Sequence, residues 1–387
     1  MTILIAVIAA GAAWTPATAA TQAHDHVVQS RAVVRIQQTQ VQRREQERVR
    51  QQEERVQQQR ERARAQAAER AERARRAQSQ YREEQTEKIS RTLKIGGNGE
   101  LDLSNLSGDI TITRGGAGNV QIEALKVARG RTAEEARAML PLVNVSFVER
   151  GSRAEVRVTY PRYEPGDRSR RNANVSVNFT ITAPENARIS AKSLSGSIKV
   201  TDIKGDLNVV STSGNVTVTN GARVMSAKST SGSVEIVGLR SEIAFQAGSL
   251  SGDVIVRQSR APRMELGTIS GNLTLDDVQC ERLDAQTLSG DLELTASLSK
   301  NGRYDLSSHS GTIRINPSGD TGFELDANTF SGSIQSDVTL KDQRQGVVDA
   351  GRRGPGGRAR SIRGVYGDGS ALLDITTFSG NVVIRRK

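Results

Sequence analysis

Serine is the residue whose repetition most invites a chemical explanation in this 387-residue chain. A Ser-Gly dipeptide recurs at ten serines: Ser107, Ser195, Ser213, Ser231, Ser251, Ser270, Ser289, Ser310, Ser331 and Ser379. A catalytic serine needs an adjacent base and a third group that orients the base. Nine of the ten units contain no histidine, and the exception places His309 directly before Ser310. We therefore expect rows of structural hydroxyl groups, and a surface or packing role for His309.

The sequence contains few residues that could bind a metal or carry out thiol chemistry. The single cysteine, Cys280, excludes an intramolecular disulfide and a cysteine-based metal cluster. Asp109, Asp253 and Asp291 each follow a Ser-Gly unit, but seven of the ten units carry Ser, Asn or Thr there, which disfavours a repeated calcium site. The His-Asp-His run at residues 24–26 could bind a metal, although a tail without structure explains it more simply. The sequence predicts no metal, no cofactor and no catalytic residues.

The spacing of the Ser-Gly units predicts the elements around them. From Ser195 to Ser331 the successive spacings are 18, 18, 20, 19, 19, 21 and 21 residues. Apolar or small residues fall at positions −7, −5, +2 and +4 from each glycine, as with Leu283 and Leu292 around Gly290. This alternation indicates two short strands, each with one buried face. The buried parity changes at the glycine, so we expect a turn there with positive φ, which glycine permits. The Asp, Asn, Ser or Thr that follows is expected to bond to the turn backbone.

A rung of about 19 residues is too small to be stable alone, because four buried aliphatic side chains cannot offset its backbone entropy. Stacked rungs, hydrogen-bonded about 4.8 Å apart, remove this problem. The predicted fold is therefore all-β: a single-stranded β-solenoid, or β-helix, preceded by a long basic α-helical arm. Its turn glycines should form one column: Gly108, Gly196, Gly214, Gly232, Gly252, Gly271, Gly290, Gly311, Gly332 and Gly380.

The other segments divide the chain further. An apolar run of 11 residues, Ile3–Ala13, precedes small residues and predicts a cleaved signal peptide over 1–20, with a retained anchor as the alternative. The predicted divisions after it are an Arg/Gln/Glu-rich helical arm (21–92), a first rung (93–130), an inserted helix and antiparallel strands that cap the first end (131–185), a regular solenoid (186–340), an Arg/Gly-rich loop (341–364) and a last rung (365–387). The inserted helix should begin with a capping box from Thr132 to Glu135.

Positive charge is concentrated in the arm. Residues 31–89 hold 16 Lys and Arg against 10 Asp and Glu, which is just over half of the net charge of +11. The arm could be a solvent-facing helix, a weak coiled coil that supports self-association, or a segment that docks on an acidic envelope polymer or anionic lipid. No nucleic acid partner is expected, because the chain looks exported and the arm offers only Tyr81 for base stacking.

Position −2 from the glycine carries a mostly apolar series. It holds Leu106, Leu194, Thr212, Thr230, Leu250, Ile269, Leu288, His309, Phe330 and Phe378. If the buried face switches at the glycine, this series forms an exposed ridge that could seat the arm, a second copy or a ligand. If the switch comes one residue earlier, the series belongs to the core. The candidate ridge residues are Leu194, Leu250, Ile269, Leu288, Phe330 and Phe378.

The repeated Leu-Ser-Gly-Asp followed by Ile, Leu or Val, the Thr-Ala-Glu-Glu helix start at residues 132–135 and the later alternating strands resemble a bacterial family. Its members are β-strand-repeat domains of unknown function, usually described as candidate adhesins of the cell envelope. The resemblance covers about residues 97–387. It implies an exported β-solenoid with an adhesive or envelope-sensing role, and it supplies no catalytic residues.

Two classes of function compete at this point. The first is a non-catalytic protein of the periplasm, cell envelope or cell surface that uses the solenoid as a binding or spacer module. Its partner would be an envelope polymer or protein. The second is a polysaccharide-active β-helix enzyme, which would need carboxylates and arginines gathered on one face. Envelope-stress signalling and a self-assembling scaffold are further alternatives.

Overall fold

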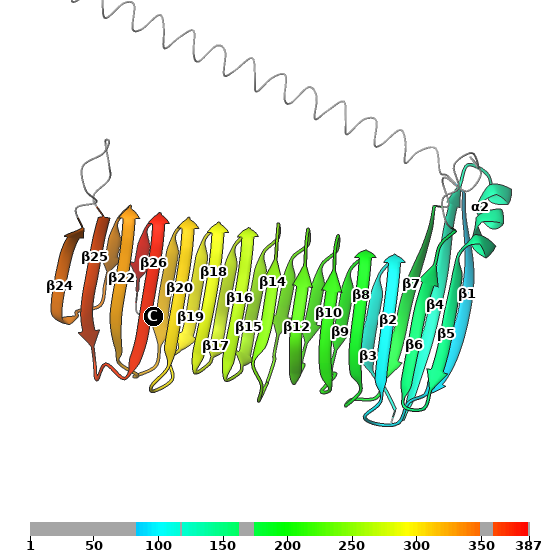
Figure 1. The fold of residues 1–387 in the computed structure, drawn as a ribbon, viewed down its shortest axis with the longest axis horizontal. Coiled ribbons are helices and arrows are strands. Elements are labelled where there is room, and N and C mark those ends of the chain that lie inside the picture. The colour runs from blue at the N-terminus through cyan, green and yellow to red at the C-terminus, as the bar shows by residue number, and fades with distance from the viewer. Residues whose placement is uncertain (1–82, 117, 162–173, 349–358, 386–387) are drawn as a thin grey trace, which may run out of the picture. The chain divides into compact units, whose positions relative to one another are not determined.

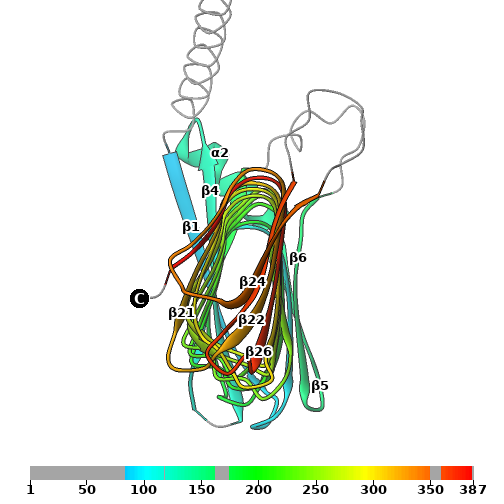
Figure 2. The same ribbon diagram turned by 90° about the vertical axis from the view of Figure 1, so that its left-hand side faces the viewer.

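A computed structural model describes residues 83–116, 118–161, 174–348 and 359–385 of the chain. The predicted signal peptide (1–20) and residues 21–82 of the predicted arm lie outside the described residues. The described chain is built from two large β-sheets, sheet A with 13 strands and sheet B with 14 (Figure 1). Figure 2, seen along the stack, shows the two sheets as opposed layers. The predicted all-β architecture is confirmed.

Each Ser-Gly unit joins one strand of sheet B to one strand of sheet A. The strands before the turns are β2 (Glu100–Ser107), β8 (Arg188–Ser195), β10 (Asp206–Ser211), β12 (Arg223–Ser229), β14 (Phe245–Ser249), β16 (Arg263–Ser270), β18 (Arg282–Ser289), β20 (Arg303–Ser310), β22 (Phe323–Ser331) and β26 (Ala371–Ser379). The strands after the turns are β3 (Ile110–Arg114), β9 (Ile198–Thr201), β11 (Val216–Thr219), β13 (Val234–Val237), β15 (Val254–Arg260), β17 (Leu273–Gln279), β19 (Leu292–Ser297), β21 (Ile313–Ser318), β23 (Ile334–Ser336) and β27 (Val382–Ile384).

Neighbouring rungs pair in parallel and in register. Val216 of β11 pairs with Ile198 of β9 on one side and with Val234 of β13 on the other. Equivalent positions of the repeat therefore stack on one another, and the alternating aliphatic residues of both sheets fill the space between them. This stacking buries the apolar face that a single rung would leave in water.

Both sheets continue past the first rung. In sheet A the order is β1 (Glu83–Lys94), β4 (Asn119–Gly130), β7 (Val175–Ala183) and then β3. In sheet B, β6 (Arg153–Thr159) pairs with β2, and β5 (Asn144–Arg150) is the edge strand. The first rung predicted over 93–130 is therefore too long, because β4 runs antiparallel to β1 and β7 and belongs to this extension.

A short helix lies within the same extension. It is α2 (Ala133–Met139), and the 3₁₀ turn η1 (Leu140–Leu142) follows it. The Thr132 hydroxyl accepts a hydrogen bond from the Glu135 amide at 3.1 Å, and the Glu135 carboxylate accepts one from the Arg131 amide at 2.8 Å. The first contact is the Thr132 half of the predicted capping box, while Glu135 binds the amide before the N-cap residue instead of that of Thr132.

The prediction of a helix is wrong for the last residues of the arm. Residues 83–92 belong to β1, which pairs with β4 across 12 successive residues. The helix-forming Glu, Gln and Lys side chains of this segment are mostly exposed, while Leu93 is buried. Pairing along the edge of sheet A overrides their local helix preference. In the described residues, none of the helices is both long and apolar enough to cross a membrane.

The C-terminal rungs do not stack in sequence order. Strand β26 lies between β20 and β22 (Figure 1). In sheet A, β27 lies between β21 and β23. The rung predicted to be last, over 365–387, is therefore an interior rung. The predicted loop over 341–364 is also wrong in part, because β24 (Lys341–Val348) and β25 (Ala359–Tyr366) form an antiparallel pair beside β22. Residues 349–358 of that loop lie outside the described residues.

Candidate interaction face

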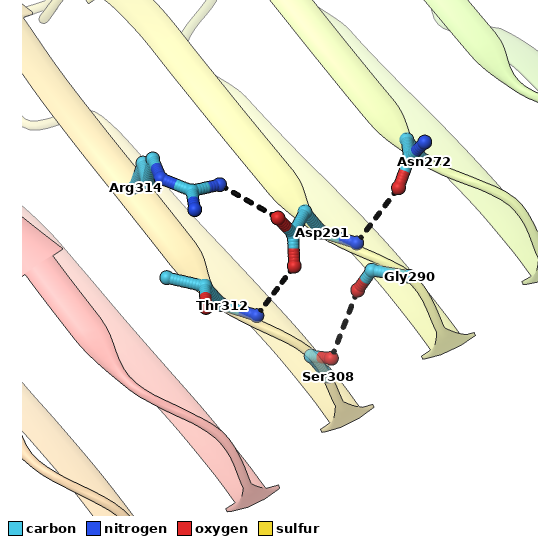
Figure 3. A network of polar contacts seen from close by, with 6 residues as sticks. All are labelled: Asn272, Gly290, Asp291, Ser308, Thr312 and Arg314. Atoms are coloured by element: carbon cyan, nitrogen blue, oxygen red, sulfur yellow. Dashed lines mark hydrogen bonds and ion pairs between the residues drawn. The ribbon is translucent and has the colours of Figure 1, made fainter.

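Seven hydroxyl groups at position −3 are buried and link adjacent rungs by donating to a turn carbonyl, whereas the buried hydroxyls of Ser193 and Thr377 have no hydrogen-bond partner within the described residues. Ser229 donates to the carbonyl oxygen of Gly214 at 2.8 Å, and Thr268 donates to that of Gly252 at 2.9 Å. Figure 3 shows the equivalent contact between Ser308 and Gly290, at 3.4 Å. Each of these hydroxyls therefore satisfies a turn carbonyl of the preceding rung. The predicted structural hydroxyl row is present at position −3.

The residue after the glycine forms a second set of contacts between rungs. The Asn272 side-chain oxygen accepts a hydrogen bond from the Asp291 amide at 3.0 Å, and the Asp291 carboxylate accepts from the Thr312 amide at 2.8 Å (Figure 3). We expected these side chains to bond to their own turn, but they bond to the next rung. The reason is that equivalent backbone amides of stacked rungs lie one strand spacing apart.

The carboxylates of this row are engaged by protein groups. Asp291 also accepts a hydrogen bond from Arg314 at 2.7 Å. Partial burial raises the pKa of the Asp291 carboxyl, but the bonds from Arg314 and the Thr312 amide outweigh it and hold the pKa below its usual value. Asp109 and Asp253 accept amide hydrogen bonds at 2.8 Å from the following rungs. Across the described residues, His, Cys, Asp and Glu form no cluster of three or more suited to a metal ion.

The ten turn glycines form the predicted single column, but mostly for a different reason. Only Gly108, Gly196, Gly290 and Gly311 have positive φ, from 112° to 158°. At Gly214 a Cβ atom would overlap the carbonyl of Gly196, and at Gly271 it would overlap that of Gly252. From Gly196 onward every turn glycine meets the carbonyl of the glycine in the rung before it. Glycine is required chiefly by this close approach of backbones.

The row at position −2 points outward, which decides between the two predicted alternatives. Leu194, Leu250, Ile269, Leu288 and Phe378 each expose 44% to 50% of their surface. Leu106, at the first rung, is also exposed. The buried face thus switches at the glycine. Along each strand, the last buried residue before the turn is the one at position −3. We call the consecutive members Leu250, Ile269, Leu288, His309, Phe378 and Phe330 the ridge.

Three rings stack at one end of the ridge. Phe378 lies between His309 and Phe330, with ring centroids 4.9 Å and 4.8 Å apart and planes within 6° of parallel. Phe330 is half-buried in this stack, whereas His309 is exposed. Sequence order would place Phe330 next to His309, so the ring stack depends on the insertion of β26 between β20 and β22. His309 is a stacking residue here, in keeping with the surface or packing role predicted for it.

A row of acidic residues, missed in the sequence, runs parallel to the ridge on sheet B. It occupies position −6 of five consecutive rungs: Glu265, Asp284, Asp305, Asp374 and Asp326. The strand register pairs each with the next. Burial raises the pKa of Asp374, and the neighbouring charges of Asp326 and Asp305 raise it further. The recurrence of Asp or Glu at position −6 of successive Ser-Gly units was the available signal.

A second turn column was also missed. Asp202, Asn220, Gln258 and Asp277, each six residues after a turn glycine, have φ between 49° and 59°. The Asn220 amide donates to Asp202 at 2.9 Å, so this column too is linked between rungs. Asp and Asn tolerate this conformation better than most residues, and their recurrence at a fixed spacing was the available signal.

A cavity lies beside this second column and away from the ridge. It has a volume of about 720 Å³, and Gln258, Asp277, Arg260 and Cys280 line part of it. Burial raises the pKa of the Cys280 thiol to about 12, so the thiol stays protonated at neutral pH. A protonated buried thiol is a poor nucleophile.

Comparisons with known proteins point to one family. The family model described as Toastrack DUF4097 matches residues 34–385. No curated protein matches the chain. A solved structure of a proposed adhesin from Bacteroides fragilis covers 77% of this chain and 97% of its own, with 15% identity and a TM-score of 0.38. A proposed lipid binding protein from Parabacteroides distasonis covers 77% and 96%, with 11% identity and a TM-score of 0.35. A proposed cell adhesion protein from Clostridium sporogenes covers 78% and 100%, with 10% identity and a TM-score of 0.20.

Proposed function

Starting from the fact that this chain belongs to the Toastrack DUF4097 family, we propose that it is a non-catalytic, exported protein that binds a partner in the cell envelope or at the cell surface. The stacked rungs act as a rigid scaffold, and the ridge on sheet B is the binding surface. The partner is an envelope protein or polymer.

The observation that carries this proposal is the exposure of large apolar side chains at the same position of consecutive rungs. Leu250, Ile269, Leu288 and Phe378 are about half exposed although their neighbours at positions −3 and −5 are buried. Scattered exposed apolar residues need no explanation, but a continuous row is typical of an interaction site. Regular pairing of the strands holds the row in place without a ligand.

The chemistry of the candidate nucleophiles supports a role without catalysis. Seven of the hydroxyls at position −3 donate to backbone carbonyls, and the Cys280 thiol is buried and protonated. A turnover assay of the full chain on acidic glycans tests this part of the proposal, and measurable hydrolysis would contradict it.

Binding is tested with the mature chain immobilised and exposed to envelope extract. Replacement of Leu250, Leu288 and Phe330 by alanine should reduce captured material at least about tenfold, since the apolar contact area is removed. Replacement of Thr217, Ile255 and Thr274 by alanine is the matched control, because these half-buried residues lie on the outer face of sheet A. Melting temperatures of both variants should stay close to that of the unaltered chain. Equal capture by the two variants would remove the ridge as the binding surface.

A further inference from the structure

Three parallel rows cross the outer face of sheet B at the last six rungs. The first is the ridge at position −2, and the third is the acidic row at position −6, which occupies five of these rungs and is continued by Gln246 in the sixth. Between them, position −4 carries mostly small or short side chains: Gly248, Gly267, Gln286, Ser307, Thr376 and Asn328. The strand register aligns all three rows along the stacking axis. We call the middle row the trough.

The trough is a measurable hollow. A cavity of about 320 Å³ lies over Gly248 and Gly267. Gln246, Glu265 and Asp284 line it at position −6, and Lys228 of the preceding rung also lines it. The ridge and the acidic row are four residues apart along each strand, which corresponds to about 13 Å at about 3.3 Å per residue. An α-helix with its side chains is about 10 Å wide. A helix lying along the trough would therefore touch both rows.

The ridge is apolar, whereas the acidic row carries charge that is only partly paired. Three acidic residues have a basic partner: Arg263 lies 2.6 Å from Glu265, Arg303 lies 3.1 Å from Asp305, and Arg363 lies 2.9 Å from Asp326. Asp284 and Asp374 have no ion pair within the described residues. The pKa of Asp374 is raised by burial and then by Asp326 and Asp305, while Arg303 and Arg363 lower it in part. Asp284 and Asp374 are therefore the two carboxylates of the row that a basic side chain of a partner could pair with.

We propose that this face binds a cationic amphipathic helix of a partner protein, which lies along the trough with its apolar side on the ridge and its Lys or Arg side chains toward Asp284 and Asp374. This inference rests on the proposed function and names the chemistry of its partner. One helical turn rises about 5.4 Å and one rung about 4.8 Å, so successive turns can meet successive ridge side chains. Six rungs span about 24 Å, the length of a helix of about 16 residues.

Other occupants fit the charge pattern less well. A second copy would bring the same acidic row to the interface, so pairing of like faces gains no charge complementarity. An anionic polymer or anionic lipid surface would be repelled by Asp284 and Asp374. A helix with one apolar and one basic side matches both rows at once.

The test uses the full chain and a labelled synthetic helix of about 16 residues, with leucine on one side and lysine on the other. A matched peptide with glutamate in place of lysine is the first control. Fluorescence anisotropy should show binding of the lysine peptide at least about tenfold tighter than that of the glutamate peptide, and a weakening of the former as salt rises toward about 0.5 M. Equal affinities would overturn the assignment of a cationic partner.

Variants of the chain assign the binding to this face. The pair Leu288→Ser and Phe378→Ser, the pair Asp284→Asn and Asp374→Asn, and Gly267→Leu, which fills the trough, should each weaken the lysine peptide at least about tenfold. A leucine at Gly267 is compatible with the fold, because the nearest atom to an added Cβ is 3.9 Å away. The control pair, Ile255→Ser and Glu293→Gln on sheet A, should bind as the unaltered chain does.

The outcomes separate this inference from the proposed function. If acidic variants alone weaken the peptide, the site is a general cation surface and the helix assignment is wrong. If none weakens it while the ridge alanine variant still loses envelope material, only this inference fails. A chain that sediments as a dimer, and as a monomer after Leu288→Ser and Phe378→Ser, would show that a second copy occupies the ridge, which also overturns it.

Discussion

At the scale of single residues, the repeat uses charge and hydrogen bonds in two different ways. At the turn, Asp291 accepts bonds from Thr312 and Arg314, and these contacts stabilise its charged form. On the sheet face, Asp374 stands between Asp305 and Asp326, and its charged form is disfavoured. Position within the rung therefore decides whether a carboxylate strengthens or weakens the stack.

Removing the charge of Asp374 on the sheet face and of Asp291 at the turn should therefore change the stability of the fold in opposite directions. The raised pKa of Asp374 means that the folded chain binds this proton more readily than the unfolded chain, so stability falls as pH rises through that pKa. Asp374→Asn should raise the melting temperature at pH 7 by about 1 °C, a small effect because Asp374 is only half-buried and solvent screens its charge. The gain in melting temperature should disappear below about pH 4, where the Asp374 carboxyl is protonated and therefore as neutral as the asparagine that replaces it.

Asp291→Asn is the matched comparison. The pKa of Asp291 is lowered, so its charge contributes stability at neutral pH that is lost as pH falls. This variant should melt lower than the unaltered chain at pH 7, and the difference should shrink in acid. Thermal melts followed by circular dichroism at several pH values check both signs. A loss of stability in Asp374→Asn at pH 7 would contradict the account of the acidic row.

At the scale of the rung, the backbones at the corner pack more tightly than the strands require. The glycine column brings each turn against the carbonyl of the preceding turn, and the hydroxyls at position −3 bond to the same carbonyls. The contact is steric at most positions, since only four of the ten glycines have positive φ. The turn backbone of one rung thus limits the turn position of the next rung to glycine.

A pair of alanine substitutions within β16 and its turn tests this contact. At Gly271 an added Cβ would overlap the carbonyl of Gly252, whereas at Gly267 the nearest atom is 3.9 Å away. Gly271→Ala should lower the free energy of unfolding by about 1–3 kcal/mol, the usual effect of overpacking. Gly267→Ala should have no such cost and should stabilise slightly, because alanine reduces the freedom of the unfolded chain. Denaturant titration measures both, and equal effects would show that the close approach is not limiting.

At the scale of the whole described stack, spatial order differs from chain order. The rung of β26 and β27 lies between the rung of β20 and β21 and that of β22 and β23. It therefore pairs on both sides, and it completes the ring stack of His309, Phe378 and Phe330. A segment near the C-terminus consequently has the contacts of an interior rung.

Removal of this rung should be worse than removal of a whole repeat from the regular region. Truncation after Tyr366 takes away a rung that is paired on both sides and leaves β20 and β22 without their shared partner. Deletion of the 19 residues 272–290 removes one period, and its neighbours can pair with each other in the same register. We expect the truncated chain to melt at the lower temperature and to lose amide protection in β20 and β22. Similar melting of both variants would mean that β22 pairs directly with β20.

Local sequence predicted the parts of this protein that depend on local contacts. Period-two alternation around each Ser-Gly unit indicated the strand–turn–strand rung, and the Thr132–Glu135 spacing indicated the start of α2, because both patterns express contacts within a few residues. The rows at positions −6 and +6 are equally regular in the sequence, but the apolar pattern that predicts strands carries no information about these polar positions.

The tertiary structure decided which rungs are neighbours, because the local pattern is the same in every rung. Every rung offers the same strands and the same turn, so nothing local chooses its neighbour, and only packing placed Phe378 beside His309. Residues 83–92 favour a helix in isolation, yet pairing with β4 made them a strand. The direction of the position −2 row depended on which residue next to the turn is the last to be buried, and the contacts between stacked rungs set that boundary.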